Sequence, residues 1–303
     1  MQEVDQYKLL YEDALNRFLQ KVKKDSNVIA VIVCGSMAYD QVWKDSDMDV
    51  SIILKDQSIE KHSYSVTENN ITINVDLYTR SYFKRLMERT IGGAFVQSYF
   101  SKGTMVYTTD ESLLDFFEEL KTPGQDDLDL AILMNAGELI GNLQKARKWY
   151  YLKKDYHYCQ YYLLNASDLI ARIIICLNGE SPTREAFQRA MKLDQATLLP
   201  LYPSLLKKEQ NKDELLLLIQ YVEDFITKHL DRISSPILEY LEDGEIKTMT
   251  MFEKYFHSEG HFLSHILDYL VEAGVIEKAT QNIRISPKGP RTVEEIAYLY
   301  MKS

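Results

Sequence analysis

The sequence is poor in several residue types whose abundance would define a class of protein. Among 303 residues there are only 3 cysteines, 7 prolines and 2 tryptophans. The cysteines (Cys34, Cys159 and Cys176) lie in apolar segments with neither CxxC nor zinc-ligand spacing, which argues against a disulfide framework or a zinc site. No apolar run is long enough to span a bilayer, and the charged N-terminus is unlike a signal peptide. We therefore expect a cytoplasmic protein with reduced cysteines and no membrane partner.

Positive charge is also in short supply. The chain has 35 lysines and arginines against 45 aspartates and glutamates, which gives a net charge of -10. Proteins that bind nucleic acid broadly usually present a basic surface, so DNA and RNA are disfavoured as partners. The acidic balance is compatible with a cationic small molecule. The apolar share of 46% is ample for folded cores, and the length suggests two or three domains.

The most informative stretch consists of two predicted strands on either side of a Gly-Ser turn. Residues 28–34 are apolar, which indicates a buried strand that ends at Gly35-Ser36. The second strand begins at Asp47, and because side chains alternate with period two, Asp47 and Asp49 point to one face. Adjacent carboxylates repel each other unless a cation lies between them, and Mg²⁺ prefers oxygen ligands. The Gly-Ser turn can offer backbone N–H groups and a hydroxyl to a phosphate.

This pattern resembles the signature of the DNA polymerase β-like nucleotidyltransferase superfamily. The signature is a hydrophobic residue, Gly, Gly or Ser, a spacer of about ten residues, then Asp, hydrophobic, Asp or Glu, hydrophobic. Here Cys34-Gly35-Ser36 and Asp47-Met48-Asp49-Val50 carry it. The superfamily usually has a third carboxylate on a later strand, and Asp76 matches that position, on one face with Asn74. The sequence departs from the pattern at Asp40, where many small-molecule members have a glycine.

The resemblance implies transfer of a nucleoside monophosphate from a nucleoside triphosphate, with ATP expected, to an acceptor hydroxyl. Asp47 and Asp49 would bind Mg²⁺, and Asp76 would join them in a site for two ions. Gly35 and Ser36 would bind the β and γ phosphates. The acceptor hydroxyl would attack the α-phosphorus, pyrophosphate would leave, and Asp76 or a carboxylate from a helical domain would take the proton.

The pattern along the chain predicts an α+β protein of three domains. Residues 1–121 form the polymerase β-like core, and the Pro-Gly pair at 123–124 marks a boundary. Residues 126–231 resemble the all-α substrate-binding bundle of aminoglycoside- and lincosamide-type nucleotidyltransferases, and residues 232–303 resemble a winged helix. Helices are predicted over 6–23, 82–89, 110–120 with Asp110 as N-cap, 128–146, 156–178, from Ser181-Pro182 onward, and over 211–231, 236–241, 249–256, 259–273 and 293–301. Strands are predicted over 71–79, 104–108, 274–278 and 283–286, with a hairpin or loop over 55–70 and a turn at Gln281-Asn282.

Polar residues on the apolar helices of the bundle have two interpretations. Asn165, Asp168 and Arg172 share one stripe of helix 156–178. They form either an internal polar network with an Asp–Arg pair that holds helices together, or the lining of the acceptor pocket. Glu138 is either a solvated helix glutamate or, by the resemblance, the catalytic base.

Three functional hypotheses follow. The first is an enzyme that modifies a small hydroxylated, aminoglycoside-like acceptor. The second is a non-catalytic nucleotide sensor whose winged helix binds DNA, but helix 259–273 contains no Lys or Arg, which favours packing, dimerisation or substrate gating for that module. The third is nucleotidyl transfer to a protein or RNA. The sequence leaves open the acceptor, the triphosphate, whether the site is active, and whether the chain forms a homodimer.

Overall fold

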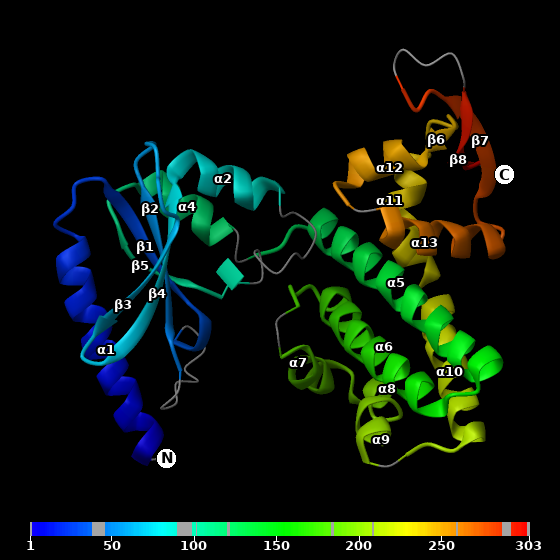
Figure 1. Ribbon diagram of the computed structural model, residues 1–303, viewed down its shortest axis with the longest axis horizontal. Coiled ribbons are helices and arrows are strands. Elements are labelled where there is room, and N and C mark those ends of the chain that lie inside the picture. Colours follow the sequence, from blue (N-terminus) through cyan, green and yellow to red (C-terminus); the bar gives the residue numbers. More distant parts are fainter. Residues whose placement is uncertain are drawn as a thin grey trace. The chain divides into compact units, whose positions relative to one another are not determined.

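The computed structural model describes residues 2–37, 46–89, 99–100, 102–119, 122–182, 185–207, 209–258, 260–286 and 292–301. The predicted Gly92-Gly93 helix break and Asp40 lie outside these ranges. The chain divides into two compact units, Met1–Pro123 and Gly124–Ser303, shown in Figure 1. In the described part of the chain no helix has both the length and the apolar character needed to cross a membrane.

The N-terminal unit is built on a five-stranded mixed sheet. The strand order is β3-β4-β2-β1-β5, and β2 and β4 run parallel while the other neighbours are antiparallel. The predicted strands over 28–34 and 104–108 are confirmed as β1 and β5. The strands are β1 Val28–Cys34, β2 Met48–Leu54, β3 Ser63–Glu68, β4 Ile71–Thr79 and β5 Thr104–Thr108.

Helices cover both faces of this sheet (Figure 1). The predicted N-terminal helix is α1, Gln2–Val22, and its Tyr11 and Phe18 pack with Val31, Val50 and other residues of one sheet face. The opposite face packs against α2, Arg80–Arg89, and α4, Glu111–Glu119. Alternation along β2 therefore gives one fully apolar face and one face that carries aspartates, as the sequence predicts.

The predicted hairpin over 55–70 is confirmed in its second half. Strand β3 pairs with β4 in antiparallel register from Ser63 opposite Asp76 to Glu68 opposite Ile71. Asn69 and Asn70 make the turn with φ of 49° and 61°. Asparagine tolerates this left-handed region better than most residues, which is why an Asn-Asn pair suits the turn. The hairpin places β3 beside β4 at the edge of the sheet.

The second unit is mainly helical. Its core contains residues of α5, α6, α10, α11 and α13, and the long helices α5 and α6 pack side by side. A one-and-a-half-turn π-helix, Lys148–Lys153, joins α5 to α6, and Gly179 ends α6 with a φ of 81°. The helices are α5 Gln125–Arg147, α6 Tyr156–Leu177, α7 Ala186–Leu193, α8 Gln195–Leu198, α9 Tyr202–Lys207, α10 Lys212–Lys228, α11 Leu230–Tyr240, α12 Met249–Phe256 and α13 Gly260–Glu272.

A three-stranded antiparallel sheet lies in the last part of this unit. Its order is β6-β8-β7, with β6 Lys247–Thr248, β7 Glu277–Ile283 and β8 Val293–Leu299. Helix α13 contributes Leu263, Ile266 and Leu270 to the same core as α5 and α6. The winged-helix assignment and the division at residue 231 stay predictions.

Four predictions about local structure in this unit are wrong. Residues 293–301 are not a helix, because strand pairing of β8 with β7 overrides the helical propensity of Glu-Glu-Ile-Ala. Gln281 and Asn282 lie inside β7 and do not form a turn, so the hairpin predicted from strands over 274–278 and 283–286 is instead the single strand Glu277–Ile283. Helix α7 begins at Ala186 instead of at Ser181-Pro182.

The fourth error concerns Pro236, which lies inside α11 and does not start a helix. A proline in a helix interior leaves the carbonyl four residues earlier without its backbone donor. In α11 that carbonyl belongs to Arg232, and the hydroxyl of Ser235 donates to it at 3.1 Å. This bond compensates for the missing N–H and allows the helix to continue through the proline.

Candidate nucleotidyltransferase site

Strand β1 leads directly into a turn that only glycine fits. Gly35 has a φ of 65°, in the left-handed region, and a Cβ atom at this position would collide with Oδ2 of Asp49. The conformation and the close approach both exclude a side chain. The predicted Gly-Ser turn therefore brings the backbone against one of the two carboxylates of β2. The side chain of Ser36 lies outside the described residues.

The strand register brings the three predicted aspartates to one face of the sheet. Asp49 lies opposite Cys34 on β1 and opposite Asn74 on β4. Asp76 follows Asn74 by two positions, so it projects on the same side. Asp47 precedes β2, and its Oδ2 accepts a hydrogen bond of 2.6 Å from Nδ2 of Asn74. Asn74 thus stands opposite Asp49, two residues before Asp76, and is hydrogen-bonded to Asp47.

Two serines of β3 also contact this group. The hydroxyl of Ser63 donates to Oδ1 of Asp76, and the hydroxyl of Ser65 donates to Oδ1 of Asn74 at 3.1 Å. The sequence pattern alone did not assign a role to Asn74 or to either serine. The signal that could have found the serines is the alternation in Ser63-Tyr64-Ser65-Val66-Thr67, which predicts hydroxyl groups on one face of a strand.

The residues beneath the aspartates are neutral. Burial, and then the charges of Asp49 and Asp76, raise the pKa of the Cys34 thiol to about 12, although its hydrogen bond with Tyr99 acts in the opposite direction. Burial, with Asp76 as the next cause, raises the pKa of Tyr78 to about 12. Burial and the neighbouring Cys34 and Asp49 likewise raise the pKa of Tyr99. Cys34 is therefore a protonated thiol at neutral pH and not a nucleophile. The prediction that the cysteines are reduced core residues is confirmed, since all three are free and buried.

Ser51 adds an unusual polar atom to this face. It lies opposite Asp76 in the β2–β4 register, and its Oγ is buried without a hydrogen-bond partner in the described part of the chain. Leaving a buried hydroxyl unpaired costs about 1–3 kcal/mol. A water molecule or another bound oxygen beside Asp76 would remove this penalty.

The donor set fits a hard divalent cation chemically. Asp47, Asp49 and Asp76 offer only oxygen atoms, which is the set that Mg²⁺ prefers. Within the described residues, no three His, Cys, Asp or Glu side chains are already arranged to hold a metal ion. Instead, Asp76 accepts a hydrogen bond from Ser63, and Asp47 accepts one from Asn74, so neutral donors hold these carboxylates.

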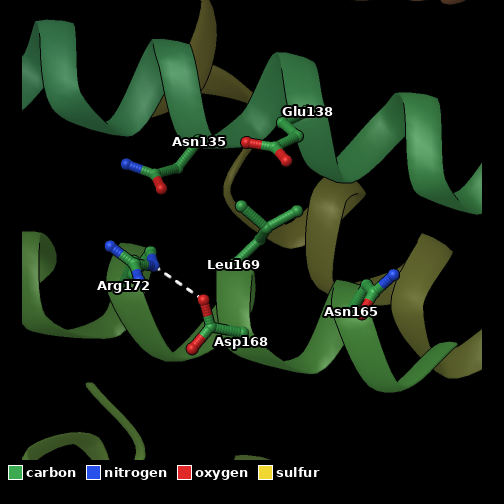
Figure 2. Close-up of a pocket in the computed structure, with 6 residues that line it drawn as sticks. All are labelled: Asn135, Glu138, Asn165, Asp168, Leu169 and Arg172. Atoms are coloured by element: carbon green, nitrogen blue, oxygen red, sulfur yellow. Dashed lines mark hydrogen bonds and ion pairs between the residues drawn. The ribbon is translucent and has the colours of Figure 1, made fainter. Parts of the chain in front are cut away.

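A separate cavity lies between α5 and α6 in the second unit. It has a volume of about 370 Å³, within the range of small-molecule sites. Figure 2 shows that Glu138 and Asn135 extend from α5 towards α6, while Arg172 and Asp168 lie on the α6 side. The lining residues are Asn135, Glu138, Asn165, Asp168, Leu169 and Arg172.

The polar stripe on α6 contains an ion pair and also lines the cavity, while its role in binding an acceptor stays a prediction. Nε of Arg172 donates to Oδ2 of Asp168 at 2.7 Å, so the predicted Asp–Arg pair exists. The pair lies within one helix and does not link helices, because its members are four residues apart. The same side chains line the cavity, together with Glu138, whose side chain is exposed. The sequence analysis did not anticipate Asn135, although it shares a helix face with Glu138 at a spacing of three residues.

Comparisons with known proteins bear on the family and the fold of the chain. Residues 16–112 match the family model described as "Polymerase beta, Nucleotidyltransferase". A nucleotidyltransferase-like protein from Exiguobacterium sibiricum 255-15 has the same fold, with a TM-score of 0.68 and 17% identity over 96% of this chain and 100% of that chain. A spectinomycin adenyltransferase from Enterococcus faecialis, solved with ATP and spectinomycin, has a TM-score of 0.32 and 14% identity over 70% of this chain and 99% of that chain, too weak a likeness to support an argument. No curated protein matches significantly.

These findings identify the class of the N-terminal unit. Residues 16–112 form a nucleotidyltransferase domain of the polymerase β family. The match includes Gly35, Asp47, Asp49 and Asp76, the residues that the sequence motif singles out. The predicted α+β class with a nucleotidyltransferase core is confirmed, and the shared fold extends over nearly the whole chain.

Proposed function

We propose that this protein transfers a nucleoside monophosphate from a nucleoside triphosphate to a hydroxyl of a small-molecule acceptor, with release of pyrophosphate. The observation that carries the proposal is the grouping of Asp47, Asp49 and Asp76 on one sheet face beside Gly35, within a domain of the nucleotidyltransferase family. Three carboxylates beside a glycine turn fit the handling of a polyphosphate together with a divalent cation.

The roles proposed for the N-terminal residues follow from their positions. Asp47, Asp49 and Asp76 would hold one or two Mg²⁺ ions. The bound metal would stabilise the negative charge that develops on the transferred phosphate. Gly35 and Ser36 bind the β and γ phosphates, since a backbone without a side chain permits close approach. Asp76 is the first candidate for accepting the proton of the attacking hydroxyl.

The cavity between α5 and α6 is the proposed acceptor site. Its carboxylates suit amines, and its carboxamides suit hydroxyl groups, which together favour a polyhydroxylated amine of moderate size. Arg172 partly neutralises the charge of Asp168. Glu138 is therefore the lining carboxylate best suited to hold a cationic group or to act as base. ATP is the expected nucleotide, on the basis of the family resemblance.

A pyrophosphate-release assay tests the proposal. The full chain with MgCl₂ is offered each of the four NTPs, alone and with a panel of aminoglycosides, lincosamides and related hydroxylated amines. Asp49→Asn, which keeps the shape of the side chain, is measured in parallel. We expect release that needs both an NTP and an acceptor and that disappears in the variant.

Other outcomes have distinct meanings. Release that is equal in wild type and in Asp49→Asn contradicts the assignment of the site. NTP binding by calorimetry without turnover, over the whole panel, favours a nucleotide sensor. Transfer of radiolabel from the α-phosphate to protein or RNA, and not to a small molecule, favours a macromolecular acceptor.

A further inference from the structure

One face of the edge strand β3 carries only hydroxyl residues. Ser63, Ser65 and Thr67 alternate along it, and in the antiparallel register they lie opposite Asp76, Asn74 and Thr72 of β4. The other face carries Tyr64, Val66 and Glu68 opposite apolar residues. Paired residues of neighbouring strands share a face, so the hydroxyls line up against the acidic face of the site.

The hydrogen bonds from this strand reach the aspartates by two routes. In the first, Ser63 donates directly to Oδ1 of Asp76. In the second, Ser65 donates to Oδ1 of Asn74 at 3.1 Å, and Nδ2 of Asn74 donates to Oδ2 of Asp47 at 2.6 Å. A carboxylate can only accept, so the amide nitrogen must face Asp47 and the amide oxygen must face the serine.

The position of Asn74 is unfavourable for its residue type on structural grounds alone. Asparagine is depleted in strands, and β4 has a neighbouring strand on each side. Asn74 nevertheless stands opposite Asp49, hydrogen-bonds Asp47 and precedes Asp76 by two residues. A neutral donor at this point fixes a carboxylate without adding a positive charge that would repel a metal ion.

We propose that Ser65 and Asn74 form a positioning relay for Asp47, and that Ser63 positions Asp76, so that β3 sets the orientation of the carboxylates for a divalent cation. This inference rests on the proposed function, because it assigns the relay to the same site. Residues that orient metal ligands through hydrogen bonds typically change metal affinity about 10–100-fold when removed. Ser63, Ser65 and Asn74 act on the cation through Asp47 and Asp76, so they are positioning residues.

Calorimetric titration of the full chain with MnCl₂ tests the relay without any need for turnover. Asn74→Ala is expected to weaken Mn²⁺ binding at least about tenfold. Ser65→Ala is expected to weaken it less, because Asn74 then keeps its bond to Asp47 but loses the partner that orients it. Ser63→Ala should weaken binding through Asp76, and Ser63→Thr, which retains the hydroxyl, should restore it. Thr67→Ala is the matched control, since Thr67 occupies the next position on the same face of β3 and should leave the affinity unchanged.

A double-mutant cycle separates the relay from independent effects. If Ser65 acts through Asn74, then Ser65→Ala causes no additional loss in a chain that already carries Asn74→Ala. Additive losses would overturn the relay. If Asn74→Ala fails to fold in thermal denaturation, then Ser65→Ala on the exposed edge strand decides the question.

The outcomes distinguish this inference from the proposed function. Unchanged Mn²⁺ affinity in both Asn74→Ala and Ser65→Ala overturns the relay even if the wild type is an active transferase, and so does a wild type that binds no Mn²⁺. Weakened Mn²⁺ affinity supports the relay even if no acceptor is found. Where turnover is measured, the relay variants should regain rate at high MnCl₂ while the KM for the acceptor stays constant, which a general loss of structure would not produce.

Discussion

The two units of the chain assemble polar side chains in different ways. In the N-terminal unit, Asp49 and Asp76 lie on one face of neighbouring parallel strands, and Asn74, which stands opposite Asp49, donates a hydrogen bond to Asp47. Acidic groups far apart in sequence thus meet at one face. In the second unit, Asp168 pairs with Arg172 one helical turn away. The strands bring like charges together, whereas the helix pairs opposite charges.

This difference bears on function. Grouping carboxylates raises the free energy of the cluster unless a cation or hydrogen-bond donors compensate, and such a cost is retained where a site needs it. An i,i+4 ion pair on a helix stabilises it slightly and needs no functional reason. The sheet face is therefore the better candidate for the chemistry, and the helical cavity is the better candidate for acceptor binding.

The largest expected effect is the loss of activity on removing a carboxylate from the sheet. Asp47→Ala and Asp49→Ala should fold but lower kcat by at least about 100-fold, because charge stabilisation of the transition state is lost. The same change at Asp168 should act mainly on the KM for the acceptor. Pyrophosphate release and thermal denaturation measure both effects. Normal transfer by the Asp47 or Asp49 variant would remove the basis for assigning the metal site.

Glu138→Gln should have the next largest effect. If Glu138 and not Asp76 accepts the proton of the attacking hydroxyl, its loss should lower kcat about 100-fold or more. The free energy of unfolding should stay the same, because Glu138 is exposed. Glu239→Gln, on the exposed surface of α11 in the same unit, is the control. A variant that keeps the kcat of the wild type would show that the base is another group, with Asp76 as the first candidate.

Two glycines with positive φ make a matched pair across the units. Gly35→Ala and Gly179→Ala should each lose about 1–2 kcal/mol of unfolding free energy from left-handed strain. At Gly35 the new methyl group also displaces Asp49, whereas Gly179 has no atom within 4 Å of the added Cβ. Denaturant unfolding and the transfer assay should therefore show a larger loss of stability, and a loss of activity, only at Gly35. Equal effects of both changes would mean that the contact with Asp49 is unimportant.

A smaller effect concerns the Arg80–Asp110 ion pair, which lies outside the site. Hydrogen bonds from Arg80 and Ser112 lower the pKa of Asp110 to about 2, and its Oδ1 also caps α4. Because the carboxyl group of Asp110 has a lower pKa in the folded than in the unfolded state, its ionised form stabilises the fold at pH values above about 3.8. This stabilisation is lost as the pH falls towards about 2. Asp110→Asn should cost about 1 kcal/mol at pH 7, and much less at pH 2. Urea unfolding at several pH values measures this.

Asp168→Asn provides the comparison for that last effect. Its Arg172 partner lies in the same helix, so the loss should be only about 0.5 kcal/mol at neutral pH. A loss at Asp168 as large as that at Asp110 would contradict the view that the local pair contributes little to stability.

The sequence predicted features with a local cause. Period-two alternation placed Asp47 and Asp49 on one face, and the Asn69-Asn70 turn and the Asp110 cap also follow from short-range preferences. The errors have two different causes, a distant strand partner in one case and a neighbouring side chain in the other. Residues 293–299 have helical propensity, but pairing with β7 makes them a strand. Pro236 lies inside α11 because Ser235 satisfies the carbonyl that the proline cannot.

The sequence by itself determined which residues can carry chemistry at the candidate site: the glycine turn, the pair of aspartates in β2 and the acidic position in β4. The tertiary structure decided how they meet. Parallel pairing of β2 with β4 sets Asn74 opposite Asp49, and the β3 hairpin sets two serine hydroxyls against the same group. Packing of α5 against α6 brings Glu138 and the polar residues Asn165, Asp168 and Arg172 to the lining of one cavity. The physical reason is that alternation along a strand depends on adjacent residues, whereas register and helix packing depend on contacts between residues far apart in the chain.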